Sequence, residues 1–588
     1  MIRLTAEQHN FAEHLPGVFV EACPGAGKTR TIVERIARIV KSLPPRRGIA
    51  VLSFTNSAIE EFIIHCHNRG LDFALRHPGF VGTFDSFLRQ FFFSPGGIEG
   101  VPIRPSVLDC WETLGIDVRL RGANAYRGEG VGLDLFDAET NEIDPTLIGY
   151  AGLRAHVQGH KDAYQRAAGM RRHYLRCHGY LSAADVRVDV VQRLQNAGWA
   201  IALGRVLAAR FKEIIVDEAQ DCNTLDCRIV NWLRQQGVTV TVVADPDQAI
   251  YGFRHGPSDI LREIAGHYAT QNRLSLTGNF RCSPSICGVA ATLRHRATPD
   301  LSLGDTADVT EPVHVLVYQG NSVTEILGRF FGELMDAAGI CRKEGIILSH
   351  IRKNALRACG SCSEDDAGDS KTAKIARVVG SFWLPSASNR VRELALQSVE
   401  RMILELMGMI DGGEIPSRAA DKRGIDRRWL RRSALELISH IPRNCDSSQE
   451  ARSAWVAVLR QQVHRLDLKY KPGTSENRYF IDRNDACWNN LLTTGNEPEF
   501  ACATIHEAKG REYSAVCVVI PPDSRDLRRT EQLFVSWSDR TDDEAKRVIY
   551  VAITRAKKLG AVAIPSAYRD RLSAILEANQ TDWQEHLV

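Results

Sequence analysis

Short runs of apolar residues recur along the chain, and most of them are followed by a segment in which apolar positions have helical spacing. In the first half of the sequence these runs lie at 18–22, 49–54, 213–218 and 238–245. A second set lies at 313–318, 345–349, 515–520 and 561–564. Buried strands that alternate with helices are typical of parallel sheets with crossover helices. The pattern therefore predicts two α/β cores.

Two long stretches between these runs have little strand character and are rich in helix formers, Arg and Trp. We expect each to be a mainly helical insertion within one core. The predicted domains are a first core at 1–88 and 182–268 with its insertion at 89–181, and a second core at 269–375 and 496–588 with its insertion at 376–495. The polar segments 359–374 and 471–477 are predicted to be linkers or loop tips.

Length, charge and composition limit the class of protein. A chain of 588 residues is too long for one hydrophobic core. Its net charge is only +3, so any polyanion must be bound by local clusters of Lys and Arg rather than by a global field. The N-terminus lacks a secretory signal pattern, and no apolar run reaches the roughly 18 residues needed to cross a bilayer. We expect a reduced, cytoplasmic protein, because its fifteen cysteines are scattered and several lie in apolar runs.

The cysteines do not form a convincing metal motif. Cys359 and Cys362 have the spacing of a zinc pair, but no second pair lies at zinc-finger distance, so a polar loop is the preferred interpretation. The pairs Cys222/Cys227 and Cys282/Cys287 are five residues apart, a spacing that does not place both thiols on one helical face. We interpret these four as packing residues.

The segment 21–30 carries the strongest chemical signal, because it follows an apolar run and precedes a helical pattern. Gly25 and Gly27 would let backbone N–H groups turn toward phosphate oxygens, and Lys28 adds a positive charge. The Thr29 hydroxyl is placed to hold Mg²⁺. The predicted nucleotide contacts in this loop are Ala22, Cys23, Pro24, Gly25, Ala26, Gly27, Lys28, Thr29 and Arg30. Ala22 replaces the first glycine of the general pattern, so a fortuitous glycine turn is the alternative for this segment alone.

Two acidic residues follow the apolar run at 214–216. At the carboxyl end of a buried strand, Asp217 would hold Mg²⁺ and Glu218 would polarise the water that attacks the γ-phosphate. The alternative is that these residues only end a strand. After the next run, Gln248 can sense the γ-phosphate, and Tyr251 and Phe253 offer flat faces for bases. As isolated aromatic residues these two would more often be core residues.

The order of such segments resembles that of the UvrD/Rep/PcrA-type superfamily 1A DNA helicases. Segment 4–8 is similar to the adenine-reading Q motif of that family, and 53–58 and 82–87 resemble its motifs Ia and Ib. Segments 276–281, 504–512 and 547–555 resemble motifs IV, V and VI. The resemblance implies two RecA-like parallel-sheet motor domains, each with a mainly helical insertion. It also implies ATP and Mg²⁺ as cofactors.

The same resemblance assigns roles to residues by position. Arg281 and Arg555 become arginine fingers that reach the γ-phosphate from the second core. Gln8 would read adenine, Phe280 and Arg30 would sandwich the base, and Glu512 would bind the ribose. The residues expected to contact single-stranded DNA are Phe54, Thr55, Asn56, Thr83, Phe84, Tyr251, Phe253, Arg254 and His506.

The function implied is an ATP-dependent single-stranded DNA translocase and 3′–5′ DNA helicase that acts on single-stranded and tailed duplex DNA. Polarity comes from the family alone. The chain departs from the family pattern at three positions: Asp85 replaces a His in motif Ib, Arg511 replaces an apolar residue in motif V, and Phe280 replaces the common Tyr. Asp85 puts one DNA contact in doubt.

Three further hypotheses stay open. The basic residues of 418–432 around Trp429 either contact duplex phosphates or form a solvated helix face, and Arg171, Arg172 and Arg176 are a weaker candidate of the same kind. In its compactness and in the residues of segment 279–282, the chain resembles the UvrD-like subunits of antiphage systems such as Gabija. The chain would then be a partner-gated ATPase bound to a TOPRIM-type nuclease. A DNA-binding assembly subunit with vestigial hydrolysis is the remaining alternative.

Overall fold

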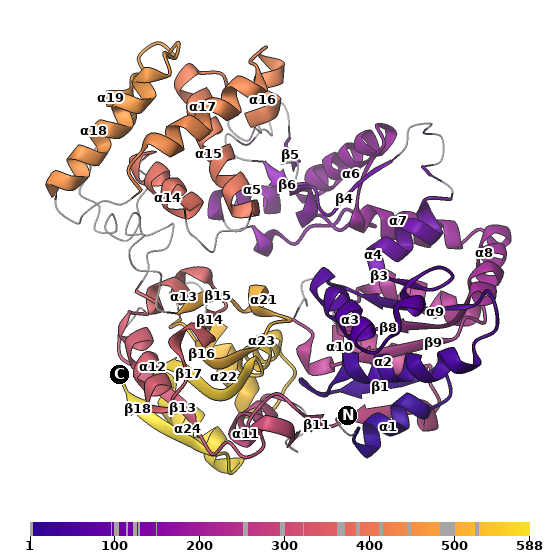
Figure 1. The fold of residues 1–588 in the computed structure, drawn as a ribbon. Coiled ribbons are helices and arrows are strands. Elements are labelled where there is room, and N and C mark those ends of the chain that lie inside the picture. Colours follow the sequence, from indigo (N-terminus) through magenta and orange to yellow (C-terminus); the bar gives the residue numbers. More distant parts are fainter. Residues whose placement is uncertain are drawn as a thin grey trace. The chain divides into compact units, whose positions relative to one another are not determined.

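The computed structural model describes residues 4–95, 97–98, 101, 105–112, 116–120, 126, 130–148, 150–250, 257–294, 300–320, 323–360, 371–383, 389–410, 416–443, 449–481, 500–523 and 529–588. The chain divides into two compact units (Figure 1). The first unit comprises Met1–Pro102, Ala183–Cys359 and Phe500–Val588, and the second comprises Ile103–Ser182 and Gly360–Glu499. No helix among the described residues is both long and apolar enough to span a membrane.

The first unit contains two six-stranded sheets in which every pair of neighbouring strands is parallel. The first sheet has the order β10-β1-β9-β8-β2-β3. Its strands are β1 (Phe19–Ala22), β2 (Gly48–Ser53), β3 (Phe80–Thr83), β8 (Phe211–Val216), β9 (Val240–Ala244) and β10 (Arg273–Leu276). Its helices are α1 (Ala6–Glu13), α2 (Lys28–Ile39), α3 (Asn56–Asn68), α4 (Phe84–Phe87), α7 (Ala183–Leu194), α8 (Ala197–Arg210), α9 (Thr224–Gln235) and α10 (Pro257–Gly266).

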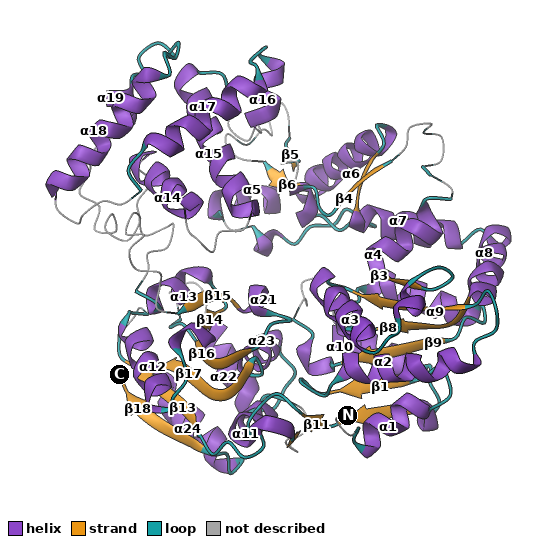
Figure 2. Ribbon diagram, viewed as in Figure 1, coloured by secondary structure: helices purple, strands orange, loops and turns teal. Residues whose placement is uncertain are grey.

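The second sheet has the order β15-β14-β16-β17-β13-β18. Its strands are β13 (Val313–Tyr318), β14 (Gly345–Ser349), β15 (Ala501–Thr504), β16 (Tyr513–Val519), β17 (Ala556–Pro565) and β18 (Trp583–Leu587). Its helices are α11 (Pro284–Thr292), α12 (Ile326–Ala337), α13 (Arg352–Ala358), α21 (Ile505–Ala508), α22 (Arg529–Ser538), α23 (Glu544–Ile553) and α24 (Arg569–Ala578). Strands and helices alternate in both cores (Figure 2). This confirms the predicted mixed α/β class with two parallel-sheet cores.

The cores bury the Val- and Ile-rich strands on both faces, as parallel sheets require. One charged pair lies inside the first core, where Arg35 and Glu213 are fully buried and 2.9 Å apart. Arg35 also donates to the carbonyls of Phe11 and His14, and Thr241 donates to Glu213. The pair therefore has the hydrogen bonds that a buried charge needs, and it ties α1 and α2 to the sheet.

Several domain boundaries differ from the prediction, and the second insertion lies within Gly360–Glu499 rather than 376–495. Strand β10 pairs with β1, so the first sheet extends beyond residue 268, where we expected the first core to end. The helical segment Leu88–Phe93 belongs to the first unit, so the insertion begins after residue 102 rather than at 89. Both segments of the first core continue to pack on the first sheet beyond the predicted limits, because β10 pairs with β1 and the ring of Phe91 contacts that of Phe211 in β8.

The second unit holds two hydrophobic clusters, one from each insertion. The segment 103–182 combines α5 (Ala151–Gly159) and α6 (Lys161–Cys177) with the short strand pairs β4 (Ser106–Leu108) with β7 (Tyr180–Ser182) and β5 (Asp117–Val118) with β6 (Val131–Gly132). It is therefore less helical than we expected. The segment 360–499 contains α14 (Lys371–Trp383), α15 (Asn389–Met407), α16 (Pro416–Lys422), α17 (Arg427–His440), α18 (Gln449–Arg465) and α19 (Glu476–Tyr479). Its described part is helical, as predicted.

Candidate nucleotide-binding site

The glycine-rich loop lies between β1 and α2, at the carboxyl edge of the first sheet. Gly25 and Gly27 have φ of 67° and 69°, in the left-handed region that favours glycine. A Cβ on Gly25 would lie 2.6 Å from the Cβ of Arg281 and 2.7 Å from Asn279 Oδ1. Glycine is therefore required by both backbone conformation and close packing. Gly27 is the N-cap of α2 and makes no side-chain cap bond, and the first N–H groups of a helix are a favourable site for an anion.

Three contacts from outside the loop hold it in place. The N–H of Cys23 donates to Leu276 O at 3.0 Å, and the N–H of Phe280 donates to Gly25 O at 2.9 Å. Gln8 Nε2 donates to Ala26 O at 2.9 Å, while Gln8 Oε1 accepts from the Thr5 N–H in the capping box of α1. The Gln8 amide thus supports the loop, and its predicted role in reading adenine stays a prediction.

The two carboxylates after β8 lie beside the loop lysine. Glu218 Oε1 is 3.8 Å from Lys28 Nζ, and the Glu218 N–H donates to Asp217 Oδ1 at 2.9 Å. Burial, with a further contribution from Glu218, raises the pKa of Asp217 to about 7. Burial alone would also raise the pKa of Glu218, but the charges of Lys28 and Lys509 outweigh it and lower that pKa. Glu218 is therefore ionised at neutral pH. Its φ of 54° and ψ of 39° place it in the left-handed region.

A chain of hydrogen bonds leads from Glu218 to the second core. Gln220 Nε2 donates to Glu218 Oε2, and Gln220 Oε1 accepts from the Asp245 N–H at 3.0 Å. Gln248 Nε2 donates to Asp245 Oδ2 at 2.7 Å, and Gln248 Oε1 accepts from Arg555 Nη2 at 3.0 Å. Gln248 thus lies between the first core and the guanidinium of the second.

The two predicted arginine fingers differ in surroundings. Arg555 is 3% exposed, and burial followed by the charge of Arg281 lowers its pKa to about 10, so it remains protonated at neutral pH. Arg281 donates from Nε to Glu512 Oε1 at 2.7 Å and from Nη1 to Thr554 O at 3.3 Å. The main chain next to Arg281 contacts the glycine-rich loop, whereas its side chain contacts the second core. Residue 281 is thus at the junction of the cores rather than on the second core alone.

Glu512 pairs with two cationic side chains. Its Oε1 accepts from Arg281, and its Oε2 lies 3.0 Å from Lys557 Nζ. Burial would raise the pKa of Glu512, but these two cations lower it. The role in ribose binding therefore requires Glu512 to exchange one of these partners. Phe280 is half-buried and packs against Gly304 and Gly278, and Arg30 lies on α2. Their stacking on a base stays a prediction.

Residues predicted to contact DNA follow the strands of both sheets. Thr55 and Thr83 cap α3 and α4 by accepting from Ala58 N and Ser86 N. Asn56 is exposed at the start of α3, and His506 Nε2 lies 3.4 Å from Ile250 O. Tyr251, Phe253 and Arg254 lie outside the described residues.

The structure corrects the prediction for Phe84. Its ring is fully buried and stacks under Phe54 with centroids 5.3 Å apart, so it cannot offer a face to a base. Phe54 is half-buried, and its predicted base contact remains untested. Asp85, which replaces a family histidine, lies 2.5 Å from Arg187 Nη1, and Arg187 Nε donates to Asp226 at 2.7 Å. Asp85 therefore has a structural partner in α7.

Sequence reasoning missed one pair that bridges the cores. Lys509 Nζ lies 2.5 Å from Asp221 Oδ1 and 3.5 Å from Gln248 O, and the side chains of Lys509 and Asp221 are both buried. Lys509 lies in segment 504–512 and Asp221 lies just after the two acidic residues 217 and 218, but their pairing joins positions 288 residues apart, and no local pattern encodes it. Gln220 and Asp245 were missed for the same reason.

The structure also bears on the two groups of basic residues that were predicted as possible duplex contacts. In the basic segment 418–432, Arg427 pairs with Asp421, and Arg431 pairs with Glu393 and Glu400. These acidic partners favour the solvated-face interpretation. Arg172 donates to the carbonyls of Leu133 and Phe136, so it supports the fold of the insertion.

The cysteine pairs are interpreted above as packing residues. Cys287 Sγ donates to Cys282 O at 3.7 Å, and Cys282 Sγ donates to Thr554 O at 3.6 Å. All four side chains are buried and unoxidised, which agrees with their predicted packing role.

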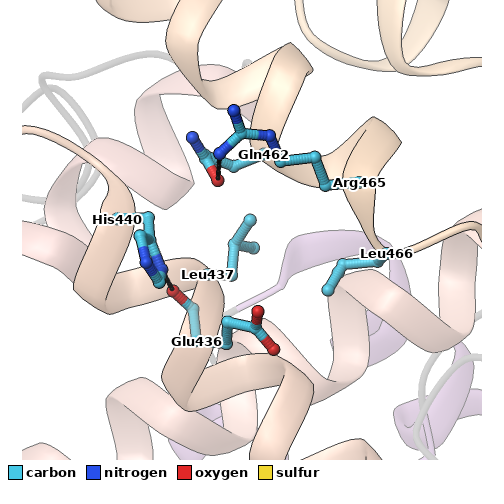
Figure 3. A pocket seen from close by; sticks show the side chains of 6 residues that line it. All are labelled: Glu436, Leu437, His440, Gln462, Arg465 and Leu466. Carbon is cyan, nitrogen blue, oxygen red and sulfur yellow. Dashed lines mark hydrogen bonds between the residues drawn. The ribbon is translucent and has the colours of Figure 1, made fainter.

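A small pocket in the second unit is separate from this chemistry. It lies between α17 and α18 and is lined by Glu436, Leu437, His440, Gln462, Arg465 and Leu466 (Figure 3). Three of these side chains already have partners: His440 Nδ1 lies 2.8 Å from Glu436 O, and Arg465 Nη1 donates to Gln462 Oε1 at 3.3 Å. None of the predicted nucleotide or DNA contacts lines this pocket.

Comparisons with known proteins agree with this geometry. The chain matches the family model of the UvrD/REP helicase N-terminal domain over residues 4–92 and 141–269, and that of the UvrD-like helicase C-terminal domain over residues 436–563. ATP-dependent DNA helicase UvrD2 of Mycobacterium tuberculosis is 24% identical over 576 residues, covering 92% of this chain and 75% of the relative. ATP-dependent DNA helicase PcrA of Leuconostoc citreum is 24% identical over 294 residues, covering 47% of this chain and 37% of the relative. DNA helicase II of Escherichia coli is 24% identical over 296 residues, covering 47% and 38%.

Proposed function

The chain belongs to the UvrD/REP helicase family, and from this premise we propose that it hydrolyses ATP to move along single-stranded DNA and to unwind duplexes with a 3′ overhang. It is an ATP-dependent DNA helicase by family. The direction of travel, the translocation step and the roles of individual residues are our proposal.

The observation that carries the proposal is the buried polar chain from Lys28 and Glu218 to Arg555. It joins the glycine-rich loop and the carboxylates of the first core to a guanidinium of the second. Phosphoryl transfer needs charges held on both sides of the γ-phosphate, in a site of low dielectric. A site assembled from two cores links hydrolysis to the relative position of those cores.

In this proposal, the loop N–H groups and Lys28 bind the β- and γ-phosphates. Glu218 is ionised and polarises the attacking water. Gln248 contacts the γ-phosphate, and Arg281 and Arg555 stabilise the charge that develops on it. ATP would then draw the cores together, and hydrolysis would release them.

Mg²⁺ is the metal that we propose for this site. Asp217 and Thr29 offer carboxylate and hydroxyl oxygen, the hard donors that Mg²⁺ prefers. The raised pKa of buried Asp217 fits as well, because a cation beside this carboxylate would stabilise its ionised form. When bound, Mg²⁺ would neutralise phosphate charge.

The test is ATP hydrolysis by the purified chain with and without single-stranded DNA. We expect strong stimulation by DNA and loss of turnover in Lys28→Ala and Glu218→Gln, by about 10²-fold or more for the second variant. Appreciable hydrolysis by either variant would contradict the site assignment. Unwinding of 3′-tailed but not 5′-tailed duplexes would support the proposed polarity. Binding of ATP with a near-zero rate on DNA would instead favour the partner-gated, Gabija-like subunit, which no structural observation favours.

A further inference from the structure

The segment Gln248–Ile250 belongs to the first core by sequence but is held by the second. Three consecutive backbone carbonyls face side chains of that core. Arg547 Nε donates to Ala249 O at 2.7 Å, Lys509 Nζ lies 3.5 Å from Gln248 O, and His506 Nε2 lies 3.4 Å from Ile250 O. Each carbonyl thus has its own partner from motif V or motif VI.

The side chains of the segment show the same attachment. Ile250 is fully buried within the hydrophobic cluster of the second core, together with Ile286 and Tyr550. Ala249 is also fully buried. A main chain fixed by hydrogen bonds and an apolar side chain fixed by burial move together with the surface that holds them.

Arg547 makes the shortest of these three contacts, and it is itself held. Its side chain is 11% exposed, and its Nη1 pairs with Asp542. It lies on α23, the helix that ends just before Arg555. The segment 547–555 therefore contacts two neighbouring residues. Arg547 donates to the carbonyl of Ala249, and Arg555 donates to the side chain of Gln248.

We propose that Arg547 is a positioning residue that couples DNA binding to ATP hydrolysis, by fixing Ala249 between Gln248 and Ile250, whose carbonyl faces His506. This rests on the proposed function, in which Gln248 contacts the γ-phosphate, and on the prediction that His506 contacts single-stranded DNA. Without the Arg547 bond, the segment loses the shortest of its three contacts with side chains of the second core. DNA binding would then no longer place Gln248 and Arg555 together.

The experiment compares basal and DNA-stimulated ATP hydrolysis in Arg547→Ala and Arg547→Lys. For Arg547→Ala we expect the DNA-stimulated kcat to fall about tenfold or more, because a charged hydrogen bond to the segment is lost. The basal rate, the KM for ATP and the Kd for single-stranded DNA should stay within about threefold. Arg547→Lys can still donate one bond to the carbonyl and should recover part of the stimulation.

The matched control is Arg569→Ala, which removes an arginine of the same core whose partner is Glu585. It should keep full stimulation. Stimulation at the wild-type level in folded Arg547→Ala would overturn the proposal, and so would an equal fall of basal and stimulated rates. If thermal unfolding shows that Arg547→Ala does not fold, Arg547→Gln replaces it with the same two outcomes. A wild-type chain that DNA does not stimulate would contradict the proposed function itself.

Discussion

At the scale of single residues, Arg555 of the second core contacts Gln248 of the first. It is buried, donates to Gln248 and stays protonated, although burial lowers its pKa to about 10. A cation in a region of low dielectric interacts strongly with charge that develops on a phosphate. In the proposed function, the glycine-rich loop and Lys28 provide most of the ground-state binding of ATP. Arg555 should therefore act on the chemical step.

Arg555→Ala tests this division of roles. We expect kcat to fall by about 10³-fold, the lower end of the effect of an arginine finger, while ATP affinity changes by less than about fivefold. Steady-state hydrolysis and titration with a fluorescent ATP analogue measure the two quantities. Arg555→Lys is the matched control, because it keeps the charge but not the forked geometry, and should fall between the two. Unchanged turnover in Arg555→Ala would remove this residue from the finger role.

At the scale of elements, β18 is an edge strand held to its neighbour by a histidine pair. His314 Nδ1 on β13 lies 2.9 Å from His586 Nε2 on β18, and His314 Nε2 lies 2.9 Å from Glu311. Burial, followed by the charge of His314, lowers the pKa of His586. The contact thus favours neutral His586 in the folded state.

This lowered pKa predicts how stability changes with pH. The unfolded chain takes up a proton at His586 near pH 6.5, whereas the folded chain does so only at lower pH. Stability should therefore fall as the pH drops from about 7 to 5. The Tm of His586→Gln should fall less over this range than the Tm of the wild type. Thermal unfolding at several pH values measures this difference. His178→Gln, which changes an exposed histidine, is the control. Equal pH dependence in His586→Gln and the wild type would show that this contact carries no proton linkage.

The edge strands also explain what the sequence could predict of the fold. All eight expected strands are present, and each lies inside its sheet. Within the two six-stranded sheets, the strands that were not expected, β3, β10, β15 and β18, are the edge strands. An interior strand of a parallel sheet is buried on both faces and leaves a continuous apolar run, whereas an edge strand is partly exposed and carries polar residues. Arg273 and Ser275 in β10 are examples.

The sequence likewise predicts some residues of the candidate site but not the partners of others. The glycine-rich loop, Asp217 and Glu218 could be predicted as site residues because each belongs to a short segment with a local sequence pattern. The partners of Gln8, Glu512 and Asp85 could not, because each lies in a distant segment and only the folded chain brings it close.

At the scale of the whole molecule, a buried ion pair joins the two cores of the first unit. Lys509 and Asp221 come from different sheets, and both side chains are less than a tenth exposed. Removing one partner of such a pair leaves a buried charge without compensation, which costs far more than the loss of an exposed pair. The cores should therefore depend on this contact for cooperative unfolding.

We expect Lys509→Met to lower the free energy of unfolding by about 3–5 kcal/mol and to broaden or split the calorimetric transition. Lys509→Met with Asp221→Asn should recover part of the loss, because the charge left behind is removed. Arg352→Met is the control, since its pair with Glu507 is exposed and contributes less than about 1 kcal/mol. A single sharp transition with wild-type stability in Lys509→Met would show that the pair does not join the cores energetically.

The backbone of Glu218 has a consequence for laboratory evolution. A non-glycine residue in the left-handed region costs roughly 1–2 kcal/mol, and at this position glycine would adopt the same φ and ψ without that cost. Glycine at position 218 would remove this backbone cost together with the carboxylate that lies beside Lys28 and accepts from Gln220, so a variant selected for thermal resistance that carries it would lack the proposed base. Any programme that seeks a robust variant of this enzyme should hold residue 218 constant and look for stability elsewhere.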